Sequence, residues 1–211
     1  MYTLEGAYKT SLMREAFKGG NAVFTCPPFP IKCGGAPQKI LYLSEDTFRK
    51  NGVRDNASVK YYAATPLMFP PNDDFNAALN ETCLSKGIEQ FFKHNLTEID
   101  KNNRVATFLD RGSGDQIKQE FDFLHFVPPQ AAPEFVAKSS LAHESGWLDV
   151  NINTLQHNKY SNVFGLGDIA NLPTAKTAAA IFSQAPVVVN NILKELGEVE
   201  KSAVYDGYGA C

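Results

Sequence analysis

Short β-rich runs alternate with amphipathic segments in the first part of the chain, and this alternation limits the possible folds more than any other feature. Residues 21–25 are apolar and partly β-branched, and Cys-Pro-Pro follows them. Residues 36–52 carry apolar side chains at helical spacing, with Pro37 in the first turn and an Asn-Gly stop. A β-rich run at 57–65 and a helical segment at 72–87 repeat the pattern. The sequence therefore predicts an α/β fold.

The remainder of the chain is predicted to be less regular. A proline-rich stretch at 128–133 is typical of a crossover between layers or domains. An alanine-rich helix is predicted over residues 174–197, with a kink expected at Pro186. The further strand candidates are residues 88–110, 119–129, 146–150 and 162–168.

Composition excludes several classes of protein. With 211 residues, 44% hydrophobic and 20% charged, the chain can bury one large core or two modest ones. The net charge of -3 gives no reason to expect a nucleic-acid partner. No run approaches the ~18 apolar residues of a membrane span, although peripheral attachment stays open. The N-terminal residues include Glu5 and Glu15 and lack an apolar core, so no targeting signal is predicted.

The cysteines point to a reactive group rather than a scaffold. Cys26, Cys33, Cys83 and Cys211 match neither a secreted disulfide framework nor a zinc motif. Cys33 precedes a predicted helix start, where the helix dipole and Lys32 and Lys39 would stabilise a thiolate. Gly34 and Gly35 would let a flat cofactor or a substrate approach closely. A loop cysteine that only packs explains the same local features equally well.

A second candidate site lies where the run at 162–168 ends in Gly165-Leu166-Gly167-Asp168. An acid beside a helix start can accept hydrogen bonds from ligand hydroxyls. The pattern is not a G-x-G-x-x-G fingerprint, and taken alone it is more often an ordinary turn. The histidines, His94, His125, His143 and His157, show no ligand spacing, and we assign none to metal binding or catalysis.

Three motifs together resemble a known family. "KCGGAPQK" around Cys33, "GDIANLPTAKTAAA" from Gly167, and the terminal "YDGYGAC" occur in one order. Together they are similar to the later half of sulfide:quinone oxidoreductases of the mitochondrial, eukaryotic type. The resemblance runs from about Asn21 to Cys211. It implies a flavoprotein of the two-dinucleotide-binding-domain type, with an FAD/NAD(P)-binding Rossmann-like fold that is incomplete in this chain.

The resemblance also implies roles for single residues. Cys33 and Cys211 match the redox-active cysteine pair, and Cys26 and Cys83 match no catalytic position. Asp168 would contact FAD and Lys176 would lie beside the flavin ring, with Gly34, Gly35 and Gly167 close to the cofactor. Sulfide would attack the cysteine pair, electrons would pass through FAD to ubiquinone, and sulfane sulfur would go to glutathione or sulfite. The implied location is the mitochondrial inner membrane, with peripheral attachment.

The resemblance has gaps that keep alternatives open. The family's opening G-x-G-x-x-G turn for the ADP half of FAD is missing, so the chain is interpreted as a fragment that binds FAD poorly and tends to aggregate. Residues 1–130 would be the remainder of a second, NAD-like dinucleotide-binding domain that carries Cys33. Residues 131–211 would be the C-terminal part of the FAD-binding domain and the start of the C-terminal region. The alternatives are an inactive truncated paralogue that only binds or dimerises, and a related flavin disulfide reductase or type II NADH dehydrogenase.

Overall fold

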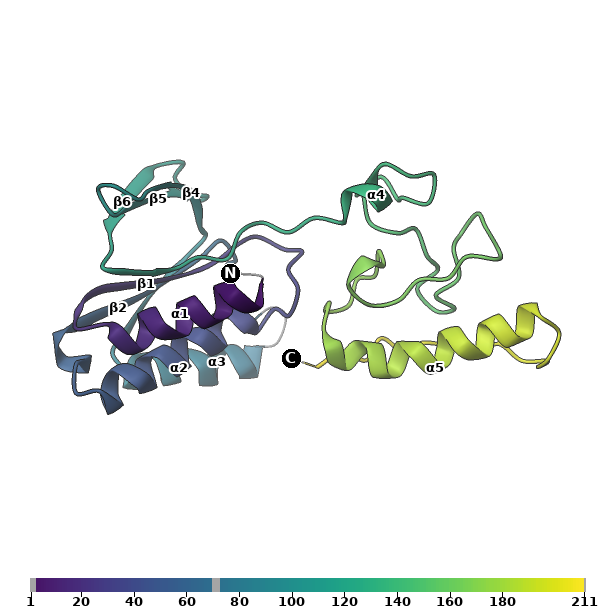
Figure 1. Ribbon diagram of the computed structural model, residues 1–211, viewed down its shortest axis with the longest axis horizontal. Helices are drawn as coiled ribbons and strands as arrows, with labels where there is room; N and C mark the ends of the chain where they lie inside the picture. Colours follow the sequence, from purple (N-terminus) through teal and green to yellow (C-terminus); the bar gives the residue numbers. More distant parts are fainter. Residues whose placement is uncertain (1–2, 70–72, 211) are drawn as a thin grey trace. The chain divides into compact units, whose positions relative to one another are not determined.

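Figure 1 shows the computed structural model of the chain, which describes residues 3–69 and 73–210. The chain divides into two compact units. Unit 1 comprises Met1–Phe29 and Gly35–Pro129, and unit 2 comprises Pro30–Gly34 and Gln130–Cys211. The loop with Cys33 thus groups with the C-terminal part of the chain. The identities of the two domains remain predictions.

Unit 1 is built on a parallel sheet with strand order β3-β2-β1-β7. Its strands are β1 (Gly20–Cys26), β2 (Ala57–Ala63), β3 (Ile88–Phe92) and β7 (Phe123–His125), and each pairs in parallel with its neighbour. Five consecutive residues at the end of β1 are buried, as expected for a strand covered on both faces. The α/β prediction is confirmed.

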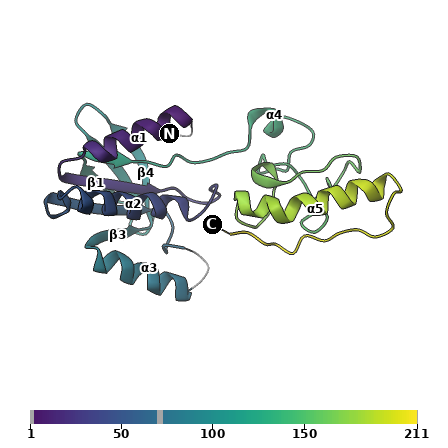
Figure 2. The same cartoon turned by 60° about the horizontal axis from the view of Figure 1, so that its bottom comes forward.

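Three helices lie side by side on one face of this sheet (Figures 1 and 2). They are α1 (Leu4–Ala16), α2 (Ala36–Lys50) and α3 (Asp73–Ser85). Helix α2 buries Leu41 and Phe48 against the sheet, and Arg49 and Lys50 complement the dipole at its last turn. The predicted helices at 36–52 and 72–87 are confirmed, whereas α1 was not foreseen.

An antiparallel sheet of three strands covers the other face (Figure 1). It contains β4 (His94–Asp100), β5 (Val105–Asp110) and β6 (Gln116–Glu120). Val23 and Tyr62 of the parallel sheet pack against Ala106 and Phe108 of β5. The predicted piece at 119–129 is corrected, because residues 119 and 120 end β6 and residues 123–125 form β7 in the other sheet.

Unit 2 has little regular structure apart from α5 (Ala178–Glu195). A short helix, α4 (Glu134–Ala137), and a 3-10 turn, η2 (Gly167–Ile169), hold its remaining helical residues among those described. The predicted strands at 146–150 and 162–168 are wrong, because these residues form only isolated bridges such as Leu148 with Ala170. The last helix starts at 178 rather than 174, because the Thr177 side chain accepts a hydrogen bond from Ala180 N and caps it.

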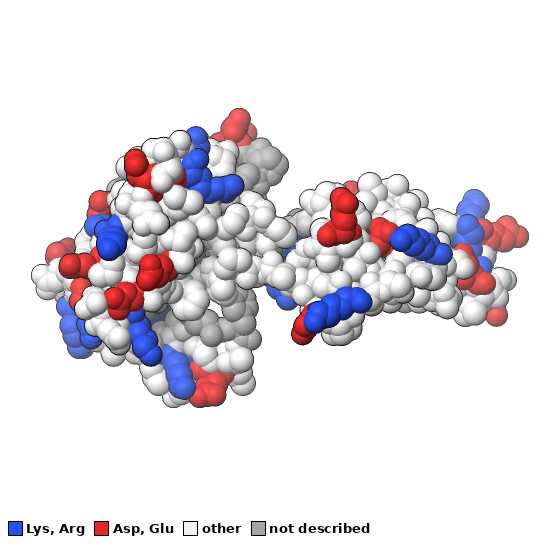
Figure 3. Space-filling model, turned by 90° about the horizontal axis from the view of Figure 1, so that it is seen from above, with Lys and Arg blue, Asp and Glu red and all other residues white. Residues whose placement is uncertain are grey.

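Charged side chains are mixed on the surface, and helix hydropathy was compared with that of a membrane span. On the face shown in Figure 3, acidic and basic side chains are interspersed and no large area has a single sign. None of the helices in the described part of the chain combines the length and apolarity needed to cross a membrane.

Candidate functional site

The Cys33 loop is fastened to the rest of unit 2 by backbone contacts. Cys33 N donates to the carbonyl of Lys176 at 2.7 Å, and Lys32 forms a parallel bridge with the same residue. Lys32 N also donates to Gln130 Oε1 at 2.6 Å. Two of the sequence-predicted site residues, Cys33 and Lys176, are therefore adjacent in the fold although they are far apart in the chain.

Cys33 has an unusual backbone. Its φ is 53°, in the left-handed region, where a residue with a side chain costs of order 1 kcal/mol or more. Its neighbour Gly35 caps α2 with a φ of -86°, a value open to any residue, so this backbone position does not itself require glycine. Strain of this kind is concentrated at functional sites, which favours a functional rather than a packing role for Cys33.

Asp168 lies in the η2 turn, opposite the Cys33 loop. Its Oδ2 is 3.5 Å from Lys32 Nζ, and about two fifths of each side chain is exposed. Gly167 has a φ of 71°, and its N–H donates at 2.7 Å to Oε1 of the buried Gln184 in α5. A hydrogen bond from Gly167 to α5 thus holds the turn, and the Asp168 carboxylate on this turn is partly exposed.

Lys176 is a buried cation, with only 8% of its surface exposed. Its Nζ donates to the carbonyl of Ala170 at 2.6 Å and lies 4.0 Å from the ring centroid of Trp147. Burial lowers the pKa of Lys176, Asp168 raises it in part, and Lys32 lowers it further. The Trp147 ring face offsets part of the desolvation by a cation–π contact. Trp147 is itself buried.

The C-terminal tail reaches the same region. A Cβ built on Gly209 would lie 3.6 Å from Ala175 Cβ, so the tail backbone runs in contact with the residue before Lys176. Tyr205 is buried beneath it. Cys211 lies outside the described residues.

The sequence analysis did not identify four residues of this region, because their contacts come from distant segments: Trp147, Gln130, Gln184 and Tyr205. Only Tyr205 could have been found from the sequence, because it belongs to the terminal motif.

The other cysteines behave differently. Cys26 and Cys83 are free and buried, whereas Cys33 is disulfide-bonded. Burial raises the pKa of Cys26 to about 11, although a hydrogen bond with Tyr61 opposes the shift. Burial also raises the pKa of Cys83, whose Sγ lies 3.5 Å from the Tyr42 hydroxyl. Both thiols are thus protonated near neutral pH and poorly nucleophilic.

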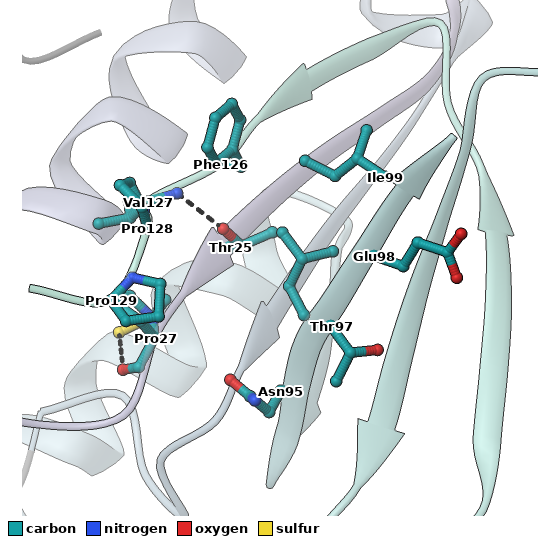
Figure 4. A pocket seen from close by; sticks show the side chains of 12 residues that line it. Thr25, Pro27, Asn95, Thr97, Glu98, Ile99, Phe126, Val127, Pro128 and Pro129 are labelled. Atoms are coloured by element: carbon teal, nitrogen blue, oxygen red, sulfur yellow. Dashed lines mark hydrogen bonds between the residues drawn. The ribbon is translucent and has the colours of Figure 1, made fainter. Parts of the chain in front are cut away.

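Unit 1 contains a cavity of about 240 Å³ near the ends of β1 and β7, drawn in Figure 4. Thr25 accepts a hydrogen bond from Val127 N at its wall, and β4 residues 95–99 form the opposite side. The described residues that line it include none of the predicted site residues. Across the described part of the chain, no three His, Cys, Asp or Glu side chains are grouped so that they could hold a metal ion.

Two curated proteins are similar to this chain over its whole length. The chain is 41% identical over 215 residues to the mouse protein named "Sulfide:quinone oxidoreductase, mitochondrial", and 41% identical over 212 residues to the protein of that name in Dictyostelium discoideum. Each alignment covers 100% of this chain, and 47% and 46% of the two relatives.

The chain is a homologue of the mitochondrial sulfide:quinone oxidoreductases. It spans about half the length of the curated relatives it matches. The resemblance seen in the three motifs is thereby confirmed. No protein-family model matches the chain.

Solved structures agree on the fold. A chain in the cryo-EM structure of the Tetrahymena thermophila mitochondrial ATP synthase matches with a TM-score of 0.80 at 28% identity, covering 94% of this chain and 48% of that one. The sulfide:quinone oxidoreductase of Aquifex aeolicus matches with a TM-score of 0.78 at 20% identity, covering 92% and 48%. The thioredoxin reductase of T. acidophilum matches at 0.60 and 16% identity, covering 89% and 56%. The chain therefore shares its fold with a sulfide:quinone oxidoreductase and a thioredoxin reductase.

Proposed function

We propose that this chain carries the redox half of a flavin-dependent sulfide:quinone oxidoreductase, with Cys33 and Cys211 as its cysteine pair. The observation that carries the proposal is the convergence on residues 174–176, where Cys33 N bonds to Lys176 O and Gly209 contacts Ala175. Each further residue extends the reach of a chain by at most about 3.8 Å, so a tail held at Gly209 keeps Cys211 near this segment. The relatives' printed name supports the activity.

The chemistry begins with the sulfurs. Hydrosulfide attacks one sulfur of a Cys33–Cys211 disulfide, the S–S bond breaks, and one cysteine keeps the added sulfur as a persulfide while the other leaves as a thiolate. The positive charge of the neighbouring Lys32 would favour the thiolate at Cys33. A small acceptor such as glutathione or sulfite then takes the sulfane sulfur from the persulfide.

The residues present fit a flavin. The Asp168 carboxylate is partly open, the Gly167 backbone has no side chain to block an approach, and Lys176 supplies a fixed ammonium. Gly34 and Gly35 would leave space on the other side of Cys33. We propose that Asp168 accepts hydrogen bonds from flavin hydroxyls and that Lys176 favours negative charge on the ring. After the sulfane sulfur has left, two cysteine thiolates remain. A bound FAD would accept the two electrons released when these thiolates re-form the disulfide, and would pass them to ubiquinone.

We further propose a mitochondrial location with peripheral attachment to the inner membrane. The names of the relatives support the compartment. Fractionation of mitochondria checks the attachment, because a peripheral protein is released from the membrane by carbonate or high salt. Retention after both treatments would contradict it.

The test of activity replaces the matched half of the mouse enzyme by this chain, because the alignment covers the chain completely. The chimera is expected to reduce quinone with sulfide. Cys33→Ser or Cys211→Ser should lower turnover by at least about a thousandfold while flavin absorbance is kept. Cys26→Ser and Cys83→Ser are the matched controls and should retain activity.

A second measurement covers the case of a chimera that does not fold. Peptide mapping of the oxidised 211-residue chain is expected to find Cys33 linked to Cys211. Turnover that survives in either serine variant would remove that cysteine from the mechanism. A folded chimera that binds flavin and reduces no quinone would instead favour an inactive binding fragment.

A further inference from the structure

The C-terminal tail of unit 2 is held by the buried Tyr205 and, just before it, by the buried Asn191, whose side chain bonds both Ala203 N and Ala203 O. Only 3% of Tyr205 is exposed, and its ring packs in a core cluster with Leu155, Val187 and Val188. Tyr205 N donates to the carbonyl of Asn153 at 2.8 Å. Residues 206–210 are all exposed, so Tyr205 is the last buried anchor of the described tail.

The hydroxyl of Tyr205 folds the tail back on itself. It donates to the carbonyl of Tyr208 at 2.6 Å and lies 3.4 Å from Thr174 Oγ1. Asp206 closes the same turn, because its Oδ1 accepts from Tyr208 N at 3.0 Å, and Gly207 supplies the left-handed φ of 87°. The turn directs the following residues along the segment that also bonds Cys33.

We propose that Tyr205 is a positioning residue that latches the tail onto residues 174–176 and so raises the effective concentration of the Cys211 thiol at Cys33. This inference rests on the proposed function, because it assumes that these two cysteines form the redox pair. If only the covalent chain connected the tail to unit 2, Cys211 would meet Cys33 rarely. If Tyr205 latches the tail, the entropy of ordering the tail is lost during folding and no longer opposes the meeting of the two cysteines. Tyr205 touches neither sulfur in this scheme and acts through the tail.

Tyr205→Phe is the direct test, since it keeps the buried ring and removes the hydroxyl that bonds Tyr208 and Thr174. The fraction of the 211-residue chain with a Cys33–Cys211 disulfide is measured in glutathione buffers of known ratio. Loss of about one net hydrogen bond should lower the effective concentration of the pair about fivefold. Tyr208→Phe is the matched control, because that side chain is half exposed and its backbone makes the tail contacts. It should leave the equilibrium unchanged, as should the circular dichroism of both variants.

A second readout separates the latch from the proposed function. Hydrogen–deuterium exchange of the peptide covering residues 203–210 is measured in a Cys211→Ser background, where no disulfide can contribute. Tyr205→Phe should raise exchange there, and Asp206→Ala, which removes the other bond of the turn from an exposed position, should do so as well. If the parent chain forms no Cys33–Cys211 disulfide, the proposed pair fails and the latch is judged by exchange alone. Unchanged exchange and an unchanged disulfide equilibrium in Tyr205→Phe would overturn the latch.

Discussion

Lys176 is both buried and a cation, and these two properties oppose each other energetically. A buried ammonium is disfavoured by desolvation, and only one carbonyl and one aromatic ring face it in the described contacts. A methionine would fill a similar volume at no desolvation cost. The retention of a cation at such a position is typical of a site where its charge acts on a ligand.

The lowered pKa of Lys176 gives a pH-dependent prediction. Because its folded pKa lies below its unfolded value of about 10.4, the unfolded chain binds more protons between the two values, and stability rises with pH in that interval. Lys176→Met should remove this contribution. We therefore expect the free energy of unfolding of the parent chain, relative to Lys176→Met, to increase from pH 7 to pH 10 in urea titrations.

Lys159→Met, at an exposed position, is the control and should show a constant difference across the same range. A constant difference for Lys176→Met as well would show that burial does not perturb this ammonium. The variant should also bind flavin more weakly if the proposed role is correct.

At the scale of elements, one buried carboxylate joins α2 to the chain around it. Glu45 is completely buried and forms ion pairs with Arg49 of the same helix, with Arg54 of η1 (Arg54–Asn56) at 3.3 Å, and with Lys86 beyond α3 at 2.9 Å. Arg54 also donates to the carbonyls of Ala57 and Lys86. Although burial alone would raise the pKa of Glu45, the hydrogen bonds from Lys86 and Arg49 lower it overall.

Glu45→Gln should therefore destabilise unit 1, because it leaves these cations without their carboxylate; the expected loss is about 3 kcal/mol at pH 7. The lowered pKa of Glu45 determines how its contribution to the free energy of unfolding changes with pH. The contribution is complete above the unfolded value of about 4.3 and disappears as pH falls through the folded value. Urea unfolding at pH 7 and at lower pH checks both points. Asp46→Asn, one residue along on the exposed side, should have no measurable effect, and an equal loss in both variants would contradict the network.

Elements were predictable where burial imposes a repeating pattern. Leu41 and Phe48 repeat on one face of α2, and two prolines follow the buried run of β1, so both elements were found from the sequence. Helix α1 was missed because none of its residues is buried, so it lacks the buried apolar face that identified α2. The runs at 146–150 and 162–168 resemble strands in composition, but each finds only single-residue partners.

Some residues of the candidate site could likewise be predicted from the sequence, and others could not. Cys33, Asp168 and Lys176 were found because they belong to motifs, and the structure brings them together through Lys32. Trp147 and Gln184 could not be found, because their roles depend on contacts across long stretches of sequence. Sequence spacing does not reveal such contacts before the chain has folded.

At the scale of the whole molecule, each unit exposes an apolar stripe on a helix. In unit 1, α1 exposes Leu4 (91%), Tyr8 (64%) and Leu12 (50%) at intervals of one turn. In unit 2, α5 exposes Phe182 (83%), Val189 and Leu193 on one face, and its C-cap residue Leu196 (69%) continues that face. The spacing of Phe182, Val189, Leu193 and Leu196 is that of the a and d positions of a heptad, the pattern by which helices pair. Continuous apolar faces of this kind promote association or aggregation in water.

We therefore expect the purified chain to self-associate through the α5 stripe. The double variant Phe182→Gln and Leu193→Gln should shift the chain toward monomer in size-exclusion chromatography with light scattering, because glutamine keeps helix propensity and removes apolar surface. Phe135→Gln is the matched control: Phe135 is 76% exposed on the short helix α4, which has no second apolar residue exposed beside it in a stripe. If the double variant and the control associate to the same extent as the parent chain, the stripe is not the surface that holds the molecules together, and α1 becomes the next face to test.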